Sequence, residues 1–420
     1  MDIFKFGGAS VKNPEAVRKV GEILSSHADE PLVIVVSAMG KTTNALEDLI
    51  EQSRQHTHYK RLQELYRFHQ SVAQELLGKP LEEIEGLFQE LSLALREGAE
   101  SQSHARHYDR IIAFGELAST KIVAAYLQER GLPAVWVSAY ELIQTDEQWR
   151  EARVNWQATG AQVQKVIGEW VDKGYIPITQ GFIGATAQGV PTTLGREGSD
   201  YTAAILAYSL QAKGVTIWKD VPGVLNADPK RWPETALYRQ LPYSDASEMT
   251  YYGASVIHPK TIRPLASKGI PLYVRSFVHP EQEGTCIGGF EQLEPALPAI
   301  ILKGGQSLLH FDARDLESIS QRHLAHLIQE LSALRVPIHL MMNTAVSFSV
   351  CIDTQPHKIE AIKSRLSEEF HIREQAYLEL VTLMWPTEEL LSQCYDPQCA
   401  LLTLRTHNRM QFVREETLGA

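Results

Sequence analysis

Residues 31–37 read Pro-Leu-Val-Ile-Val-Val-Ser, and this stretch decides the fold class. Its five central residues are all apolar and mostly β-branched, which is typical of a strand that helices cover on both faces. Before it, residues 3–6 form a shorter apolar strand, and Asn13 and Pro14 supply an N-cap and a proline at the first helical position. This order of strand, helix over 14–25 and strand predicts the start of a parallel sheet.

The alternation of helix and strand continues further along the chain. We expect helices over 116–130, 157–172 and 200–213, and strands over 134–138, 175–180 and 215–219. This spacing is typical of βαβ units. Residues from about 44 to 106 lack a strand candidate and a glycine pair, so a helical insertion is predicted there. We therefore predict an α/β domain over 1–291, with a mainly parallel sheet sandwiched by helices.

A chain of 420 residues is longer than one hydrophobic core usually organises, so a second domain is expected. Residues 292–298 are polar and contain prolines, which is typical of a linker. Beyond it, strands are expected near 299–303, 336–352, 371–385 and 400–413, and helices near 315–333, 357–369 and 387–393. This order predicts an α+β, ferredoxin-like region over 298–420.

Composition and charge exclude several classes of partner. Forty basic and 51 acidic side chains give a net charge of -11 without an evident basic patch, so no nucleic acid partner is expected. No apolar run is long enough to cross a bilayer, and the N-terminus lacks the pattern of a leader peptide, so we expect a cytoplasmic protein without a membrane partner. The four cysteines lack metal-site spacing, which favours free thiols and no protein-bound metal.

A Gly-Gly turn follows the first strand, in residues 5–8, Lys-Phe-Gly-Gly. The glycines let backbone N–H groups approach phosphate oxygens, and the lysine offers positive charge to a transferring phosphoryl group. Taken alone, the motif also fits an ordinary turn. Residues 40–42, Gly-Lys-Thr, do not complete a P-loop, because Val35 stands where that motif needs a glycine.

Three other stretches are candidates for ligand binding. Residues 192–200, Thr-Thr-Leu-Gly-Arg-Glu-Gly-Ser-Asp, place an arginine between glycines and can hold a carboxylate. Glu116 is expected where a loop enters a helix, either as an acid favoured by the helix N-terminus or as a receiver of an ammonium group. Residues 220–230 combine a Pro-Gly turn with two acids and a lysine, which fits a surface turn as well as a nucleotide loop.

Taken in order, the motifs between residue 3 and about residue 278 resemble those of aspartate kinases, which belong to the amino-acid kinase superfamily and carry C-terminal ACT-like regulatory domains. The resemblance rests on Lys-Phe-Gly-Gly-Ala-Ser, Val-Val-Ser-Ala-Met-Gly-Lys-Thr-Thr, Phe-Gly-Glu, Gly-Phe-Ile-Gly, Thr-Thr-Leu-Gly-Arg-Glu-Gly-Ser-Asp, Asp-Val-Pro-Gly-Val and Tyr-Gly-Ala-Ser-Val-Ile-His-Pro. It implies transfer of the ATP γ-phosphoryl group, with Mg²⁺ carried by ATP, to the β-carboxylate of L-aspartate. The product, 4-phospho-L-aspartate, would begin lysine, threonine and methionine biosynthesis.

The resemblance also implies a role for each matching residue. Lys5 would stabilise charge on the transferring phosphoryl group, and Asp200 would orient that lysine. Glu116 would accept the α-ammonium group of aspartate, and Arg196 would bind its α-carboxylate. The other aspartate-site residues would be Ser37, Ala38, Thr43, Phe182 and Ser199. The ATP site would comprise Lys5, Gly7, Gly8, Lys219, Asp220, Leu225, Lys230 and Ser255, with Asp228 nearby.

Several positions depart from the family pattern. They are Ala9, Glu197, Lys219, Leu225 and Ser255, and Glu197 replaces a glycine directly after the substrate-binding arginine. The ACT-like region would form a homodimer or a higher homo-oligomer. Its first-helix turn, residues 311–316, differs from the usual effector loop, so an amino-acid effector is possible but feedback by lysine or threonine is expected to be altered or absent.

Two alternatives stay open. One is a related amino-acid kinase with another acidic substrate, although a free α-ammonium group calls for the acid at Glu116, whereas an acetylated substrate does not. The other is a catalytically impaired paralogue that senses amino acids, which the departures at Glu197, Lys219 and Ser255 suggest and the presence of Lys5 and Asp200 opposes.

Overall fold

The computed structural model describes residues 1–27, 30–98, 103–232, 234–254, 256–314 and 319–416. The chain divides into two compact units. The first contains Met1–Val224, Leu237–Ser247 and Val256–Pro295, and the second contains Leu225–Ala236, Glu248–Ser255 and Ala296–Ala420. Two short segments that precede the predicted linker in sequence therefore belong to the same unit as the C-terminal region.

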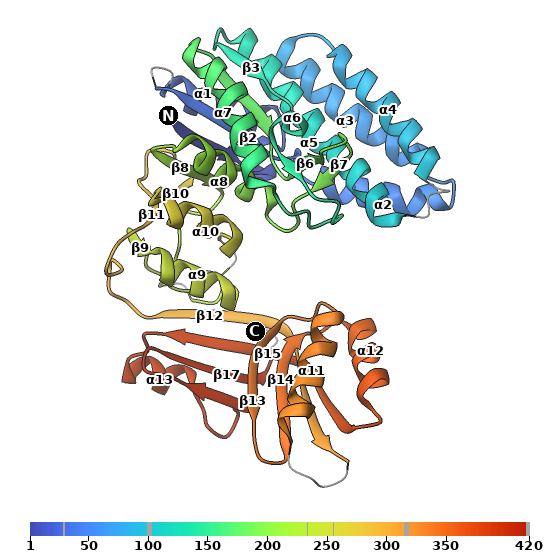
Figure 1. The fold of residues 1–420 in the computed structure, drawn as a ribbon. Coiled ribbons are helices and arrows are strands. Elements are labelled where there is room, and N and C mark those ends of the chain that lie inside the picture. The colour runs from blue at the N-terminus through green and yellow to red at the C-terminus, as the bar shows by residue number, and fades with distance from the viewer. Residues whose placement is uncertain (28–29, 99–102, 233, 255, 315–318, 417–420) are drawn as a thin grey trace. The chain divides into compact units, whose positions relative to one another are not determined.

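The first unit is built on an eight-stranded sheet (Figure 1). Its order is β3 (Ala134–Trp136), β5 (Ile176–Gln180), β2 (Leu32–Val36), β1 (Asp2–Phe6), β8 (Gly214–Lys219), β10 (Leu272–Ser276), β11 (Thr285–Gly288) and β9 (Gln240–Pro242). The strands from β3 to β10 are parallel, and only the pairing of β10 with β11 is antiparallel among these strands. The mainly parallel sheet predicted from the sequence is confirmed.

The central strands are buried on both faces of the sheet, and their side chains alternate between the two faces. All five residues of β2 are buried, as expected for a strand with helices on both faces. In β1, Phe4 and Phe6 join the hydrophobic cluster that includes Val17 of α1 (Pro14–Ser25). Since side chains alternate along a strand, Lys5 points to the opposite face, where α8 (Gly198–Leu210) lies. This alternation aims a buried lysine at the start of α8.

The helices of the first unit mostly match the sequence prediction. Asn13 caps α1, because its side chain accepts a hydrogen bond from the Ala16 N–H at 2.9 Å. Helix α7 (Trp156–Asp172) is where it was expected, and α10 (Pro259–Lys268) was not foreseen. The predicted helical insertion corresponds to α2 (Thr42–Arg54), α3 (Tyr59–Leu77) and α4 (Glu82–Gly98).

One prediction for this unit is wrong. The helix expected over 116–130 is α5 (His104–Glu129), so Glu116 lies in the middle of a helix rather than at its entrance. Gly115 lies within this helix, and an added Cβ there would lie only 3.1 Å from the Cβ of Ala38. The glycine therefore permits close packing of α5 without ending it.

Several short elements had no sequence prediction. They are a 3-10 helix (Gly8–Val11), α6 (Ala139–Leu142), α9 (Tyr243–Tyr252), and the small sheet β4 (Gln144–Thr145), β6 (Ile183–Thr186) and β7 (Pro191–Thr193). Each is too short to produce a clear hydrophobic period.

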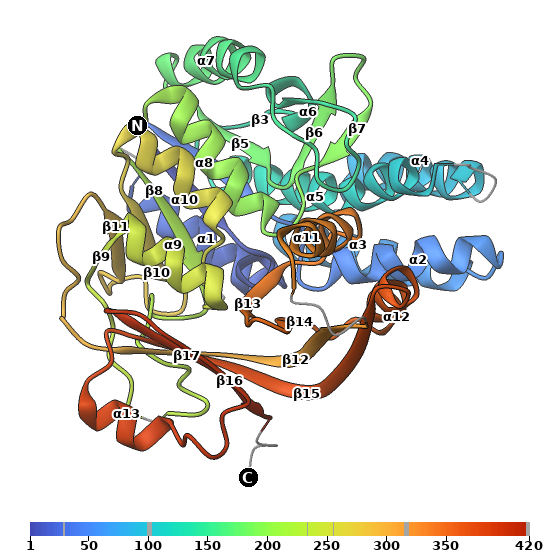
Figure 2. The same cartoon turned by 60° about the horizontal axis from the view of Figure 1, so that its bottom comes forward.

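The second unit contains a six-stranded antiparallel sheet (Figure 2). Its order is β13 (Ile338–Asn343), β14 (Ser347–Asp353), β12 (Ala299–Ala313), β15 (Phe370–Met384), β17 (Arg409–Glu415) and β16 (Leu402–Arg405). The helices are α11 (Gln321–Ala333), α12 (Pro356–Leu366) and α13 (Glu388–Cys394). Residues of α11 and α12 share one hydrophobic cluster with β12 and β14.

The structure corrects the predicted strands of this unit. The segments 336–352 and 400–413 each form two strands of a hairpin, and β12 extends ten residues beyond the expected end at Lys303. Neither turn, at 344–346 and 406–408, contains a glycine or a proline, so the sequence lacks the usual turn signal there. The helix expected near 315–333 begins at Gln321, and residues 315–318 lie outside the described part of the chain.

Candidate active site

The Lys5 ammonium group lies 2.6 Å from Oδ1 of Asp200, and both side chains are buried. Lys5 comes from the carboxyl half of β1, and Asp200 comes from the first turn of α8, where an acid is favoured. Burial acts to raise the pKa of Asp200, but the charges and hydrogen bonds of Lys5 and Lys219 outweigh it and hold the pKa below its ordinary value. Asp200 is therefore an ionised carboxylate that fixes the lysine.

A second lysine reaches the same aspartate. Lys219 ends β8, the strand beside β1, and its Nζ lies 3.3 Å from Oδ2 of Asp200. The same ammonium group donates a hydrogen bond to the backbone carbonyl of Val256. Each carboxylate oxygen of Asp200 thus faces a different lysine.

The Gly-Gly turn after β1 packs against the loop after β2. A Cβ at Gly8 would lie 2.8 Å from the carbonyl oxygen of Ala38, which is closer than real side chains come. The Gly40 N–H donates to the Gly8 carbonyl at 3.0 Å, and Gly40 itself has a positive φ of 53°. Glycine is therefore needed at residue 8 for steric reasons. The backbone of the turn also lies beside Lys5, whose Nζ is 3.5 Å from where a Cβ added to Gly7 would lie.

Glu116 is buried, with 3% of its surface exposed. Burial raises its pKa to about 8, although a backbone hydrogen bond from Ala38 and the charge of Lys5 both act to lower it. Its Oε2 atom has no hydrogen-bond partner in the described part of the chain. A buried carboxyl group with an unused acceptor is suited to receive a cation that enters the site.

The loop before α8 is held by close contacts. A Cβ at Gly198 would lie 2.5 Å from the ring of Phe182, and a Cβ at Gly181 would lie 2.4 Å from the Cβ of Ser199. The N–H of Phe182 donates to Oγ1 of Thr202 at 2.9 Å. These contacts place Phe182 and Ser199, two predicted substrate residues, at the junction of β5 and α8.

Arg196 differs from its neighbours because its side chain is exposed. It nevertheless lies within electrostatic range of His258, the N-cap residue of α10. Ser37 and Thr43, in the loop after β2 and at the start of α2, are half-buried. The arginine is thus exposed in the loop that leads from β7 into α8.

The structure adds one supporting residue that the sequence analysis missed. Asp109 on α5 is fully buried and accepts hydrogen bonds from the N–H of Arg150, the N–H of Thr193 and Oγ1 of Thr193 at 2.8–3.1 Å. Thr193 lies three residues before Arg196, so Asp109 fixes the strand that leads into this loop. Its sequence neighbours are Tyr108 and Arg110, which give no signal of a buried acid.

Four residues of the predicted ATP site and its surroundings lie outside the described part of the first unit. Leu225, Asp228 and Lys230 belong to the second unit, and Ser255 lies outside the described residues. Asp220 is exposed directly after β8. The Asp228 side chain accepts from the N–H of Lys230 at 2.9 Å, which is the geometry of a local turn.

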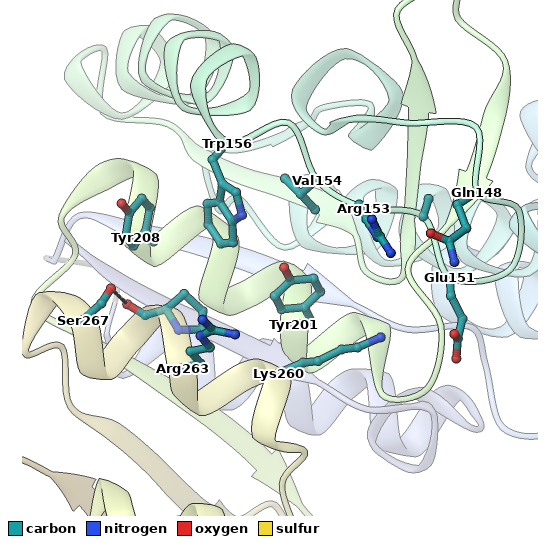
Figure 3. A pocket seen from close by; sticks show the side chains of 12 residues that line it. Gln148, Glu151, Arg153, Val154, Trp156, Tyr201, Tyr208, Lys260, Arg263 and Ser267 are labelled. Carbon is teal, nitrogen blue, oxygen red and sulfur yellow. Dashed lines mark hydrogen bonds between the residues drawn. The ribbon is translucent and has the colours of Figure 1, made fainter. Parts of the chain in front are cut away.

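A cavity of about 720 Å³ lies along α8 and α10 (Figure 3). Its lining includes Tyr201, the residue after Asp200, and basic side chains from two walls, among them Arg153, Lys260 and Arg263. Trp156 makes edge contacts with Tyr201 and with Tyr208 on the cavity wall. No residue of the predicted aspartate or ATP site lines it, so the cavity borders the site without forming it.

Comparison with known proteins identifies the family. A model of the amino acid kinase family matches residues 3–276. The chain belongs to the amino acid kinase family. It is 31% identical over 358 residues to lysine-sensitive aspartokinase 3 of Escherichia coli (strain K12), covering 84% of this chain and 78% of that protein. It is also 32% identical over 368 residues to chloroplastic aspartokinase 2 of Arabidopsis thaliana, covering 84% of this chain and 66% of the relative.

Solved structures agree with this family assignment. E. coli aspartokinase III in complex with aspartate and ADP, in the R-state, superposes with a TM-score of 0.85 at 26% identity, covering 99% of this chain and 96% of that one. The same enzyme with lysine and aspartate, in the T-state, gives a TM-score of 0.81 at 26% identity and the same coverage. The predicted fold and the predicted resemblance to aspartate kinases are both confirmed.

Among the residues that the structure describes, no helix is both long and apolar enough to cross a membrane. Within the same part of the chain, no group of three or more His, Cys, Asp or Glu side chains is arranged to hold a metal ion.

Proposed function

We propose that this chain is an aspartate kinase, which transfers the γ-phosphoryl group of ATP to the β-carboxylate of L-aspartate and forms 4-phospho-L-aspartate. The observation that carries the proposal is the buried Lys5–Asp200 pair, at 2.6 Å, within electrostatic range of the buried Glu116 carboxyl group. The similarity to aspartokinases over 84% of the chain supports the same activity.

The reaction needs positioning and charge neutralisation more than covalent chemistry. In an in-line transfer, a β-carboxylate oxygen of aspartate forms a bond to the γ-phosphorus while the bond from that phosphorus to the bridging oxygen of ADP breaks. Lys5, held by Asp200, donates to an oxygen of the phosphoryl group and neutralises part of its charge. The backbone at Gly7 and Gly8 offers N–H donors to the phosphates beside it.

Recognition of aspartate requires an acid and a cation. Glu116 is proposed to pair with the α-ammonium group, which would lower the raised pKa of this buried carboxyl group. Arg196 is proposed to bind the α-carboxylate, because a guanidinium group binds a carboxylate through two parallel hydrogen bonds. Ser37, Ala38, Thr43, Phe182 and Ser199 complete the proposed pocket.

The remaining ATP contacts are proposals from the sequence resemblance. They assign Lys219, Asp220, Leu225, Lys230 and Ser255 to the nucleotide. Mg²⁺ is proposed to arrive with ATP and would neutralise part of the charge on its phosphates.

We also propose that the C-terminal unit is a pair of ACT-like domains that joins copies of the chain into a homodimer or higher homo-oligomer in the cytoplasm. A relative of known structure was solved with lysine, which supports an amino-acid effector for the family. Feedback of this chain by lysine or threonine is proposed to be altered or absent. Strong inhibition by either amino acid at saturating concentration would contradict that proposal.

The experiment is a hydroxylamine trap. The protein is incubated with MgATP, hydroxylamine and separately with aspartate, glutamate and N-acetylglutamate, and the hydroxamate formed from the acyl phosphate is measured. Of the three acids, only aspartate should give hydroxamate. Lys5→Met should reduce the rate of hydroxamate formation by about 100-fold or more. Product from another acid instead would favour a related amino-acid kinase, and no product from any acid would favour an amino-acid sensor.

A further inference from the structure

Glu197 occupies a backbone conformation that suits glycine. Its φ is 52° and its ψ is 30°, in the left-handed region, at the N-cap of α8. A residue with a Cβ atom in this region costs about 1–2 kcal/mol relative to an ordinary conformation. A glycine here would avoid that cost. The reason for a glutamate at this position therefore lies in its side chain rather than in its backbone conformation.

The Glu197 carboxyl group is also largely removed from water. Its side chain makes no cap hydrogen bond to α8, and Oε2 has no hydrogen-bond partner in the described ranges. Four charged groups act on it, namely Lys219, Asp200, Arg196 and Lys5, and among the cations Lys219 acts most strongly. Burial raises the pKa of Glu197, and the charge of Lys219 opposes this effect. A strained backbone and a half-buried acid therefore coincide at one position beside a lysine.

Lys219 is held by two direct contacts and by the charge of a third group. Its ammonium group lies 3.3 Å from Asp200, donates to the carbonyl of Val256, and is attracted by Glu197. Lys5 approaches the other oxygen of Asp200 from the neighbouring strand at 2.6 Å. Since β1 and β8 are adjacent and parallel, both lysines extend to the same carboxylate from the same end of the sheet.

We propose that Lys219 is a second catalytic lysine for phosphoryl transfer and that Glu197 is the positioning residue that holds it. This inference rests on the proposed phosphotransferase function and gives Lys219 a role at the transferring group rather than at the rest of the nucleotide. In the transfer step both lysines donate hydrogen bonds to non-bridging oxygens of the γ-phosphoryl group. No proton leaves either lysine, so the bonds made and broken remain those between phosphorus and the aspartate and ADP oxygens.

Charge balance explains why the two residues act together. Lys5 and Asp200 form one pair of opposite charges, and Lys219 adds a cation that Glu197 offsets. Without Glu197, the Lys219 ammonium group would interact more strongly with Asp200. It would then compete with Lys5 for that carboxylate. Glu197 therefore allows a second lysine to stay charged and correctly aimed before the phosphoryl group arrives.

The first experiment compares MgATP and MgADP binding by calorimetry without aspartate. Lys219→Met should weaken MgATP binding by about tenfold and leave MgADP binding within about twofold, because only ATP presents the γ-phosphoryl group. Lys219→Arg should restore part of the preference for MgATP. Equal loss for both nucleotides, or no loss for either, would overturn the proposed role. This readout does not depend on aspartate, so it remains valid if the hydroxamate assay identifies another acceptor.

The second experiment separates positioning from structural support. Glu197→Gly should raise the melting temperature because it relieves backbone strain, yet lower kcat by about tenfold with little change in KM for aspartate. Glu197→Gln, of equal shape, should lower kcat to a similar extent. The double variant Glu197→Gly with Lys219→Met should be no slower than Lys219→Met alone, since Glu197 acts through the lysine. Unchanged kcat in both Glu197 variants, or additive losses in the double variant, would refute the assignment.

Discussion

The guanidinium group of Arg231 forms an ion pair with the buried carboxylate of Glu379 on β15. Arg414 on β17 binds the other oxygen of the same carboxylate at 2.9 Å. Arg231 belongs to the segment Leu225–Ala236, which clusters with the C-terminal unit although it lies within the region matched by the family model. A buried acid of the C-terminal sheet therefore holds a segment that contains the proposed ATP residues Leu225 and Lys230.

We expect Glu379→Gln to raise KM for MgATP several-fold and to change KM for aspartate by less than about twofold. The free energy of unfolding should fall by about 2 kcal/mol. This loss is smaller than the about 3–5 kcal/mol that follows from breaking a fully buried ion pair, because the two arginines are partly exposed. Steady-state kinetics and chemical denaturation measure both effects. Asp312→Asn is the matched control, since its partner Arg373 is 70% exposed. A loss of stability with both KM values unchanged would show that the segment does not serve nucleotide binding.

The raised pKa of Glu116 predicts a pH-dependent stability. Burial raises the pKa of Glu116 from 4.5 to about 8. A carboxyl group whose pKa is higher in the folded state stabilises the fold at low pH, and this contribution is lost as the pH rises through the folded-state value. The free energy of unfolding of the ligand-free protein should therefore decline between about pH 5 and pH 8.

Glu116→Gln should flatten the stability profile in that window and raise KM for aspartate by about 50-fold or more, because the ammonium group loses its counter-charge. Denaturation curves at a series of pH values test the first effect. Glu97→Gln is a suitable control, since that side chain is 63% exposed. The same pH slope in Glu116→Gln and in the unmodified protein would contradict the prediction.

Asp109→Asn should raise KM for aspartate by about tenfold with little effect on MgATP, because an amide cannot accept from all three donors that Asp109 binds. The strand before Arg196 would then lose its support. Asp146→Asn makes a stringent comparison, since the exposed Asp146 holds the N–H groups of Gln148 and Arg153 in the same loop. If both variants raise KM equally, general loosening of the loop is the cause.

Gly8→Ala should lower kcat by about 100-fold, because the new Cβ would lie 2.8 Å from the Ala38 carbonyl and displace the phosphate turn. Gly7→Ala should be milder, since its nearest neighbour, the Nζ atom of Lys5, would lie 3.5 Å from the new Cβ, which is an ordinary van der Waals distance. Initial rates from the hydroxamate assay compare the two. A reversed order of severity would show that contact with Lys5, rather than the packing of the two loops, controls the turn.

The sequence by itself determined the parts of the protein that depend on local patterns. The apolar run at β2 and the capped start of α1 follow from burial, backbone sterics and hydrogen bonding within a few residues. The ordered motifs then indicated the family, which the comparisons confirm. Lys5 and Asp200 were paired on the resemblance alone, and the structure places their charges 2.6 Å apart.

Only the tertiary structure decided which distant side chains meet. Glu116 acquires its raised pKa from burial in mid-helix, and Asp109 serves a loop that lies 84 residues along the chain at Thr193. The grouping of Glu197 with Lys219, and of Arg231 with Glu379, likewise joins segments with no shared sequence pattern. Such contacts depend on how strands and helices pack, and packing is set by the whole core rather than by neighbours in sequence.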